Sequence, residues 1–315
     1  MADARTASGP AVVALGGGHG LATTLRAAQR YAGELTAVVS VADDGGSSGR
    51  LRRELDVVPP GDLRKCLVAT ATDDSPWAAA FEHRFTGSEL AGHALGNLVL
   101  VGLAETLGDV GRACDEAGRL LGARARVRPA TTERVVLKAQ VDQADVEPVE
   151  VEGQVAVMEA RGTIRRVELV PSDVPADPVA LEAIRAADQV VLAPGSLFTS
   201  LLPVLVVPAI RDAVASARGQ VVQVGNLRPQ IPETEGLDGV DHLRAVLAHG
   251  GRVDVLVTAA GTPLEVDPES VAPLGVRTVR RQVSRPGAPA HDPVQLAEVL
   301  ADLLDSMTTT KGVQP

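Results

Sequence analysis

Short apolar runs alternate with helical patterns along most of the chain. Uninterrupted runs rich in β-branched residues predict buried strands, whereas apolar residues spaced three and four apart predict helices that cover a sheet. The predicted strands are Ala11–Leu15, Leu35–Val41, Gln189–Ala193, Gln220–Val224 and Val253–Thr258. The predicted helices beside them are Leu21–Tyr31, Pro178–Ala187, Ile210–Ala217, Val240–His249 and Pro293–Met307. This alternation predicts an α/β fold with a doubly wound, Rossmann-like and mostly parallel sheet.

Two stretches interrupt the alternation. Residues 61–121 carry helical spacing throughout, and residues 124–170 are β-prone and rich in charge. We therefore expect a helical region and an antiparallel β insertion within a single domain of residues 11–307, because no repeat or low-complexity linker separates modules. Residues 1–10 and 308–315 are polar and are expected to be flexible ends.

Composition narrows the classes of partner and the compartment. The 315 residues include 30 Lys and Arg against 40 Asp and Glu, a formal net charge of −10. Binders of nucleic acid or of anionic membrane surfaces usually carry a basic excess, so we expect neither partner. No apolar run reaches the roughly 20 residues of a membrane helix, and the first ten residues lack a signal-peptide pattern. With only two cysteines, which lack metal-ligand spacing, we expect a reduced, cytoplasmic protein without membrane insertion.

A glycine-rich loop follows the first predicted strand. Glycines let the backbone approach an oxyanion, and the following helix offers unpaired N–H groups and a positive dipole end to a phosphate. The spacing is neither the dinucleotide fingerprint, whose third glycine position falls on Leu21, nor a P-loop. A tight turn would need fewer glycines, so the loop favours phosphate binding. The candidate ligand-binding residues here are Gly16, Gly17, Gly18, His19 and Gly20.

An acidic, serine-rich loop follows the second predicted strand. Loops at the carboxyl ends of neighbouring parallel strands lie together, so this loop should flank the first. Asp43 and Asp44 could hold a hydroxyl group or a divalent cation such as magnesium. Asp62, farther along the chain, stands at a predicted helix start; its spacing favours a helix cap, and it is a further candidate for the cation. Ser and Arg side chains could bind phosphate or ribose oxygens, although an ordinary turn with Ser48 as helix cap is the alternative. The candidates here are Asp43, Asp44, Gly45, Ser47, Ser48 and Arg50.

Three further segments contribute candidates. Residues 193–200 lie between a strand and a helix, where backbone N–H groups could bind a second phosphate. Asn226 ends another strand at the same rim of the sheet. Asn97 follows His93 by one helical turn, so the two could share a ligand, although a lone histidine more often has a structural role. The candidates from these segments are Asn97, Gly195, Ser196, Leu197 and Asn226.

Five segments resemble, in order, the motifs of the YvcK proteins, a family of gluconeogenesis factors related to the phospholactate transferase CofD. They are GGGHGL at 16–21, VADDGGSSGRLR at 41–52, PPGDLRKCL at 59–67, GHALGNL at 92–98 and PGSLFTSLLP at 194–203. The resemblance implies a Rossmann-like domain with a nucleotide site at the tips of the strands. Carried over by position, the residues lining that site are the glycine loop, Asp43, Asp44, Ser47, Ser48, Asn97, Gly195, Ser196, Leu197 and Asn226.

What the family does supplies the leading hypothesis. The resemblance implies a regulator that binds a nucleotide sugar of the UDP-N-acetylglucosamine type and supports cell shape and wall synthesis during gluconeogenic growth. Its partners would be a UDP-sugar or related nucleotide and a cell-wall synthesis protein, and a homo-oligomer is left open. His19 and Lys65 depart from the family pattern, which usually has Thr and Asn at those positions, and Leu227–Glu235 matches a family segment only approximately.

Two enzymatic alternatives remain. A CofD-like, magnesium-dependent transferase would move a phospholactyl-type group from an activated nucleotide to a deazaflavin. The chain has one Trp, one Tyr and three Phe, so few aromatic rings could sandwich such an acceptor. A nicotinamide dehydrogenase is disfavoured because the third glycine of the fingerprint is missing. Phosphorylation of Thr308–Thr310 is a separate hypothesis that follows from their polar surroundings.

Overall fold

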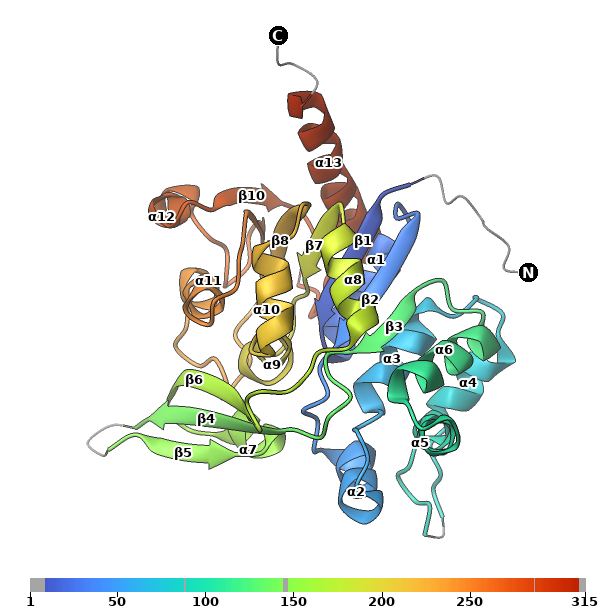
Figure 1. Ribbon diagram of the computed structural model, residues 1–315. Helices are drawn as coiled ribbons and strands as arrows, with labels where there is room; N and C mark the ends of the chain where they lie inside the picture. Colours follow the sequence, from blue (N-terminus) through green and yellow to red (C-terminus); the bar gives the residue numbers. More distant parts are fainter. Residues whose placement is uncertain (1–8, 88, 144–146, 286, 312–315) are drawn as a thin grey trace.

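Seven parallel strands form the main sheet in a computed structural model that describes residues 9–87, 89–143, 147–285 and 287–311. The order across the sheet is β10-β9-β8-β7-β1-β2-β3, and neighbouring strands pair in parallel (Figure 1). The strands are β1 (Ala11–Gly16), β2 (Glu34–Val39), β3 (Arg126–Pro129), β7 (Gln189–Leu192), β8 (Gln220–Val224), β9 (Val255–Ala259) and β10 (Arg277–Arg281). The predicted α/β, Rossmann-like fold is confirmed.

Helices cover both faces of the sheet because successive residues of each buried strand point to opposite sides. Val12 and Ala14 of β1 pack with α1, α3, α6 and α13, whereas Val13 and Leu15 pack with α8 to α11. The helices are α1 (Gly18–Ala28), α2 (Gly46–Leu55), α3 (Gly61–Thr70), α4 (Pro76–Glu82), α5 (Leu95–Leu107), α6 (Val110–Leu121), α7 (Gln154–Glu159), α8 (Pro178–Ala186), η1 (Leu197–Leu201), α9 (Leu202–Leu205), α10 (Pro208–Ala215), α11 (Gly239–Ala248), α12 (Pro268–Val271), η2 (Ala272–Leu274) and α13 (Pro293–Lys311). Two hydrophobic cores therefore lie on either side of one sheet.

The predicted β insertion is smaller than the β-prone stretch of the sequence. Strand β3 falls inside that stretch but pairs in parallel with β2 at the edge of the main sheet. The antiparallel insertion consists of β4 (Val136–Asp142), β5 (Val149–Glu152) and β6 (Thr163–Val170), and helix α7 lies between β5 and β6. Strand propensity alone does not say which sheet a strand joins, which is why the assignment of β3 was wrong.

Near the end of the chain, the hydrophobic pattern missed strand β10 and predicted a helix that is shorter than α13. Strand β10 has the sequence RTVRR, whose charged side chains suit the exposed edge of a sheet and give no apolar run to detect. Helix α13 extends to Lys311 and protrudes from the body (Figure 1). The side chains of Thr308–Thr310 lie outside the described residues, so the phosphorylation hypothesis remains a prediction.

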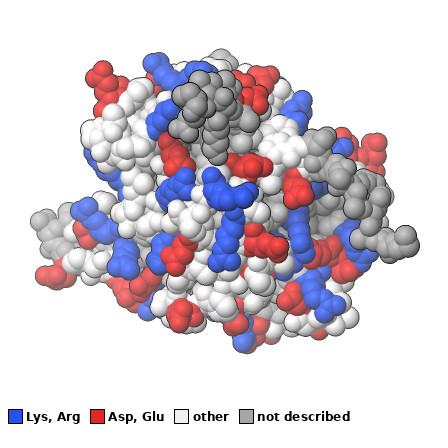
Figure 2. Space-filling view, turned by 45° about the horizontal axis from the view of Figure 1, so that its top comes forward, with Lys and Arg blue, Asp and Glu red and all other residues white. Residues whose placement is uncertain are grey.

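Surface charge and helix length test two expectations, that the protein binds no nucleic acid and that it is not inserted in a membrane. On the face shown in Figure 2, Lys and Arg side chains are interspersed with Asp and Glu, without a broad basic field. Within the described residues, no single helix is long and apolar enough to cross a membrane. The segments Leu197–Leu205 and Pro208–Ala215 together are long and apolar enough to span a membrane, but they are bent by 79° relative to each other. Leu202, Val204 and Leu205 of the first segment are fully buried in the core.

The strand order places a crevice beside β1. From β1 the chain order proceeds to β2 and β3 in one direction, and from β7 to β10 in the other. The loops that follow β1 and β7 therefore diverge to opposite sides at their carboxyl ends, which is where open α/β sheets bind ligands.

A buried ion pair joins the edge strand β3 to the start of α8 on one face of the sheet, and a further pair joins it to α6 on the other. Arg128 Nε and one terminal nitrogen donate to the two carboxylate oxygens of Asp177 at 3.0 and 2.6 Å, and Arg128 also pairs with Asp115. Asp177 in addition caps α8 by accepting a hydrogen bond from the Ala180 amide at 2.9 Å. Both partners of the central pair are almost completely buried. Removing either one would leave an uncompensated charge inside the protein.

We expect Arg128→Ala to lower the free energy of unfolding by about 3–5 kcal/mol, because Asp177 would lose its buried counter-charge. Arg126→Ala is the matched control, since Arg126 is half exposed and pairs with the same Asp115, and it should cost at most about 1 kcal/mol. Urea denaturation followed by circular dichroism measures both. Equal losses in the two variants would contradict the importance of the buried pair.

Candidate functional site

Two adjoining cavities open at the crevice beside β1. The first has a volume of about 310 Å³ and the second about 350 Å³. They share His19, Gly20, Gly195 and Gln230 in their walls. The first cavity is lined by Gly17, Gly18, His19, Gly20, Ser40, Asp43, Asp62, Lys65, Gln154, Met158, Gly195, Ser196, Thr199, Ser200 and Gln230. The second is completed by Thr23, Pro194, Asn226, Leu227, Arg228, Pro229, Pro289, Ala290 and His291.

Glycine at position 20 lets the two loops of the crevice touch. A Cβ atom at Gly20 would overlap the carbonyl oxygen of Pro194. Gly18 has a φ of +59°, which side-chain-bearing residues rarely adopt. The glycine loop therefore brings the first turn of α1 against the loop after β7. Gly17, Gly18, His19 and Gly20 line the first cavity, whereas Gly16 ends β1 and accepts a backbone hydrogen bond from Ser40 at 2.8 Å.

The carboxylate of Asp62, which belongs to α3, lies at the amino-terminal end of α1. Asp62 Oδ2 accepts a hydrogen bond from the Gly18 amide at 2.8 Å, and Asp62 Oδ1 pairs with Lys65 Nζ at 2.9 Å. This is the position that the sequence suggested for a phosphate, because the first N–H groups of a helix have no intrahelical acceptor. Asp62 satisfies one of these groups, so an anionic ligand here would meet the remaining first-turn amides and Lys65 rather than a bare helix end.

Asp43 is the second acidic side chain of the first cavity. Its carboxylate accepts hydrogen bonds from the Gly45 amide at 3.0 Å and from Ser48. Burial raises the pKa of Asp43, and the nearby charge of Asp62 raises it further. Gly61 makes this packing possible, since a Cβ atom there would collide with Ser48 and Asp43. Asp43 and Ser48 thus lie against the first turn of α3, beside Asp62.

Two candidate residues in and after the acidic loop form hydrogen bonds with the protein backbone and do not face either cavity. Asp44 accepts hydrogen bonds from the amides of Gln154 and Val155, both at 2.9 Å, and so caps α7. Arg50 donates to the carbonyl oxygens of Ala91 and Glu89 at 2.6 and 3.1 Å. Neither side chain lines the two cavities, and Gly45 packs against Val155. Their hydrogen bonds join the acidic loop to the β insertion and to the loop before α5.

Ser47 and Asn97 belong to a network, buried for the most part, that joins α2, α3, α4 and α5. Asn97 Nδ2 donates to Ser47 Oγ at 3.0 Å, and Ser47 Oγ lies 3.0 Å from His93 Nδ1. Arg64 Nε donates to Asn97 Oδ1 at 3.0 Å, and Arg64 also pairs with Glu82. Burial lowers the pKa of His93, which favours its neutral form. His93 and Asn97 both contact Ser47 Oγ, so their partners here are protein groups, and a shared ligand stays a prediction.

The loop after β7 is held by two side chains from one later segment. Asn226 accepts from the Gly195 amide at 2.9 Å and donates to the Gly195 carbonyl at 2.7 Å. Glu233 Oε1 accepts from the amides of Phe198 and Thr199, both at 2.9 Å, and burial raises the pKa of Glu233. The amides of Gly195, Phe198 and Thr199, in the segment expected to bind a second phosphate, therefore have protein acceptors. Gly195 and Ser196 line the first cavity, whereas the Leu197 side chain is buried in the core.

Several lining residues were outside the set of candidates. Lys65 lies within the PPGDLRKCL motif, and its amine is the only Lys or Arg group among the described residues that line the first cavity. Gln154 and Met158 come from α7, inside the β insertion. Nothing in the sequence pattern indicates that this insertion folds over the crevice, because α7 follows β2 in the chain by more than a hundred residues. Ser196, Thr199 and Ser200 supply hydroxyl groups opposite the glycine loop.

The donor set would suit a magnesium ion that is bound together with a ligand. Asp43 and Asp62 place two carboxylates in one cavity. Magnesium is commonly held by one or two carboxylates plus substrate phosphates and water, rather than by an all-protein cage. Within the described residues, no cluster of three or more His, Cys, Asp or Glu could hold a metal alone. A cation here would therefore need oxygen atoms from the ligand.

Comparison with known proteins places the chain in a family. Residues 12–284 match the family described as 2-phospho-L-lactate transferase CofD. A protein of Mycobacterium tuberculosis named "Putative gluconeogenesis factor" is 46% identical over 304 residues, covering 92% of this chain and 89% of the relative. The Bacillus subtilis "Gluconeogenesis factor" is 35% identical over 315 residues, covering 94% and 98%.

A solved structure agrees over nearly the whole length. A crystal structure of a UPF0052-family protein from Bacillus halodurans superposes with a TM-score of 0.88 at 35% identity, covering 93% of this chain and 99% of that one. Both the parallel sheet and the motif-bearing loops lie inside the matched residues. The chain belongs to the CofD family, and its relatives within that family include the gluconeogenesis factors.

Proposed function

We propose that this protein is a gluconeogenesis factor, a cytoplasmic regulator that binds a nucleotide sugar of the UDP-N-acetylglucosamine type at the crevice beside β1. The observation that carries the proposal is the pair of adjoining cavities that share His19, Gly20, Gly195 and Gln230. A nucleotide sugar has two bulky ends joined by a diphosphate, so it suits two cavities that meet at a narrow glycine-lined junction.

The chemistry of each cavity supports this orientation. The first cavity has Lys65, serine and threonine hydroxyls and the start of α1, which together suit phosphate and sugar oxygens. The second has the amide of Asn226, Arg228 and His291 around prolines and Leu227. No Phe, Tyr or Trp is among the described residues that line either cavity, so the base would be held by hydrogen bonds and aliphatic packing.

The proposed biological role follows the names of the relatives. A regulator needs to bind its ligand without consuming it, and the role in cell shape and wall synthesis would require a cell-wall synthesis protein as partner. Asp43, with Asp62, would hold magnesium against the ligand phosphates where the cation is required. His19, which replaces the usual Thr of the family motif, would contact the ligand at the junction of the two cavities.

We expect UDP-N-acetylglucosamine to bind saturably in isothermal titration calorimetry. Lys65→Ala should weaken binding by roughly tenfold or more, because a charge-assisted contact to phosphate contributes about 1.5–3 kcal/mol. Lys138→Ala is the matched control, since Lys138 pairs with Glu150 on the antiparallel sheet, and its affinity should equal that of the wild type. Absence of any saturable heat with UDP-sugars would refute the proposal.

We expect magnesium-dependent binding to weaken as the pH falls. Burial raises the pKa of Asp43, so a proton competes with the cation for this carboxylate. The weakening should therefore begin at a pH above the ordinary carboxyl pKa of 3.8. Titrations at pH values between about 7.5 and about 4.5, with and without magnesium, measure this effect. In Asp43→Asn the magnesium-dependent part of the affinity should be lost at all of these pH values. A wild-type magnesium effect that does not change with pH would contradict the assignment.

A CofD-like transferase is the second candidate, supported by the family match and by two carboxylates in one cavity. Such an enzyme would need charge neutralisation around the transferred group. Under the regulator proposal, incubation with a deazaflavin acceptor, nucleotide-activated phospholactate and magnesium should give no product by mass spectrometry. A product that disappears in Asp43→Asn would establish the transferase instead.

A further inference from the structure

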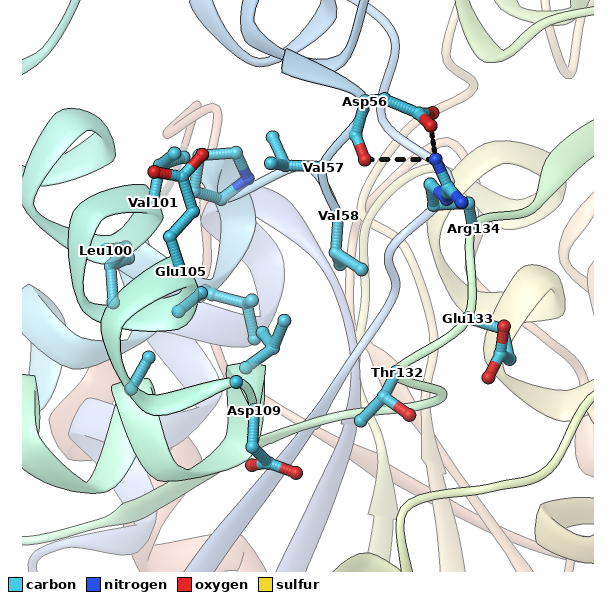
Figure 3. Close-up of a pocket in the computed structure, with 16 residues that line it drawn as sticks. Asp56, Val57, Val58, Leu100, Val101, Glu105, Asp109, Thr132, Glu133 and Arg134 are labelled. Atoms are coloured by element: carbon cyan, nitrogen blue, oxygen red, sulfur yellow. Dashed lines mark hydrogen bonds and ion pairs between the residues drawn. The ribbon is translucent and has the colours of Figure 1, made fainter.

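A third cavity, of about 500 Å³, lies apart from the crevice beside β1 (Figure 3). One wall comes from α5 and the start of α6, and the facing wall comes from residues 132–134, with residues 56–58 and 60 between them. The cavity is lined by Asp56, Val57, Val58, Pro60, Leu63, Leu100, Val101, Ala104, Glu105, Gly108, Asp109, Val110, Ala113, Thr132, Glu133 and Arg134. Most of these side chains are aliphatic, so its floor would favour apolar atoms of a ligand.

Helix α5 supplies the aliphatic part of one cavity wall. Its sequence LGNLVLVGLAETL contains Glu105 as the only charged residue. Only Gly96, Asn97, Leu100 and Val101 are buried, while Leu98, Val99, Leu103 and Leu107 are partly exposed. Val99 and Leu103 pack against the hydrophobic core, whereas Leu100, Val101 and Ala104 line the cavity. These three side chains form the aliphatic part of one wall.

The rim of the cavity is acidic. Glu105 and Glu133 stand on opposite walls, both exposed, and Asp109 precedes α6 on the same wall as Glu105 (Figure 3). Arg134 is the only Lys or Arg among the described lining residues, and it pairs with Asp56. In the described part of the chain, Glu105 and Glu133 form no ion pair with Lys, Arg or His. An apolar floor between two uncompensated carboxylates is complementary to a segment with both aliphatic and cationic side chains.

We propose that this cavity docks a basic amphipathic segment of a partner protein. Aliphatic side chains of that segment would enter between Leu100 and Val58, and its Lys or Arg side chains would pair with Glu105 and Glu133 at the rim. Helix-in-groove recognition of this kind uses apolar anchors spaced three and four residues apart on the bound helix.

The position of the cavity also connects it to the crevice beside β1. Pro60 and Leu63 line the third cavity, whereas Asp62 and Lys65 line the first. Both pairs belong to the first turn of α3 and the residue before it, so the two cavities lie on either side of one helical turn. A segment packed against Pro60 and Leu63 would shift the groups that contact the nucleotide. This coupling rests on the proposed function, whereas the docking does not.

The probe is a fluorescein-labelled model helix of Leu and Lys at amphipathic spacing, with a Leu and Glu helix of equal length as comparison. By fluorescence anisotropy the Leu/Lys peptide should bind saturably and the Leu/Glu peptide should not. Glu105→Lys/Glu133→Lys should weaken binding by roughly tenfold or more, since two charge pairs are lost. The matched control is Glu269→Lys/Glu298→Lys, on α12 and α13, which changes the net charge equally and should bind as the wild type does.

A second variant separates shape from charge. Ala104→Trp would fill the cavity without altering its acids and should also weaken binding by roughly tenfold, because the apolar anchors are excluded. Circular dichroism checks that each variant is folded. Equal binding by the rim variant and its control would overturn the proposal, because it would show attraction to net charge alone. Sedimentation that reveals a wild-type dimer lost in Glu105→Lys/Glu133→Lys would also overturn it, because a second copy would then cover the face.

The coupling has its own readout. With the Leu/Lys peptide at saturation, the affinity for UDP-N-acetylglucosamine should change by about fivefold, a typical allosteric coupling, and should not change in the rim variant. An unchanged affinity would overturn the coupling between the two cavities. The docking site would still be tested by the anisotropy measurements. If the nucleotide sugar fails to bind at all, the proposed function and the coupling both fall, while peptide binding still decides the docking site.

Discussion

The close approach of Gly20 to the carbonyl of Pro194 is the contact on which the crevice beside β1 depends. Parallel strands β1 and β7 place the two loops at the same edge of the sheet, and their helices then leave on opposite faces. Only a residue without a side chain at position 20 allows the first turn of α1 to touch the other loop. That contact divides the crevice into two cavities, and the proposed orientation of a two-ended ligand follows from the division.

Carboxylates of the protein itself shape both loops around this contact. Asp62 accepts from the Gly18 amide, and Glu233 accepts from the amides of Phe198 and Thr199. The hydrogen bonds of Glu233 satisfy N–H groups that would otherwise be buried without partners, which is costly, and Asp62 satisfies a partly buried one. They also place negative charge close to the proposed phosphate position, so Lys65 or a magnesium ion becomes important for holding an anionic ligand.

Helix α3 connects the crevice to the helical region. Its first turn presents Asp62 and Lys65 to the first cavity and Leu63 to the third. Arg64, in the same turn, reaches Asn97 of α5 within the buried network. A buried network with satisfied hydrogen bonds resists independent movement of its members. The helices that carry the proposed docking surface are thus joined to the same turn that lines the first cavity.

The amino-acid sequence by itself determined the strand and helix alternation, the parallel sheet and the glycine loop at the end of β1. These features are local, because strand burial and glycine conformation leave a direct pattern in consecutive residues. From sequence alone, Asp44, Ser47, Arg50 and Asn97 could not be distinguished from residues that line the cavities, since a polar side chain has the same pattern whether its partner is a ligand or distant backbone. Lys65 and Gln154 were missed as lining residues for the corresponding reason. Only the tertiary structure decided these assignments, because the partners of Asp44 and Arg50 come from segments that are far away in the chain and are brought together by packing.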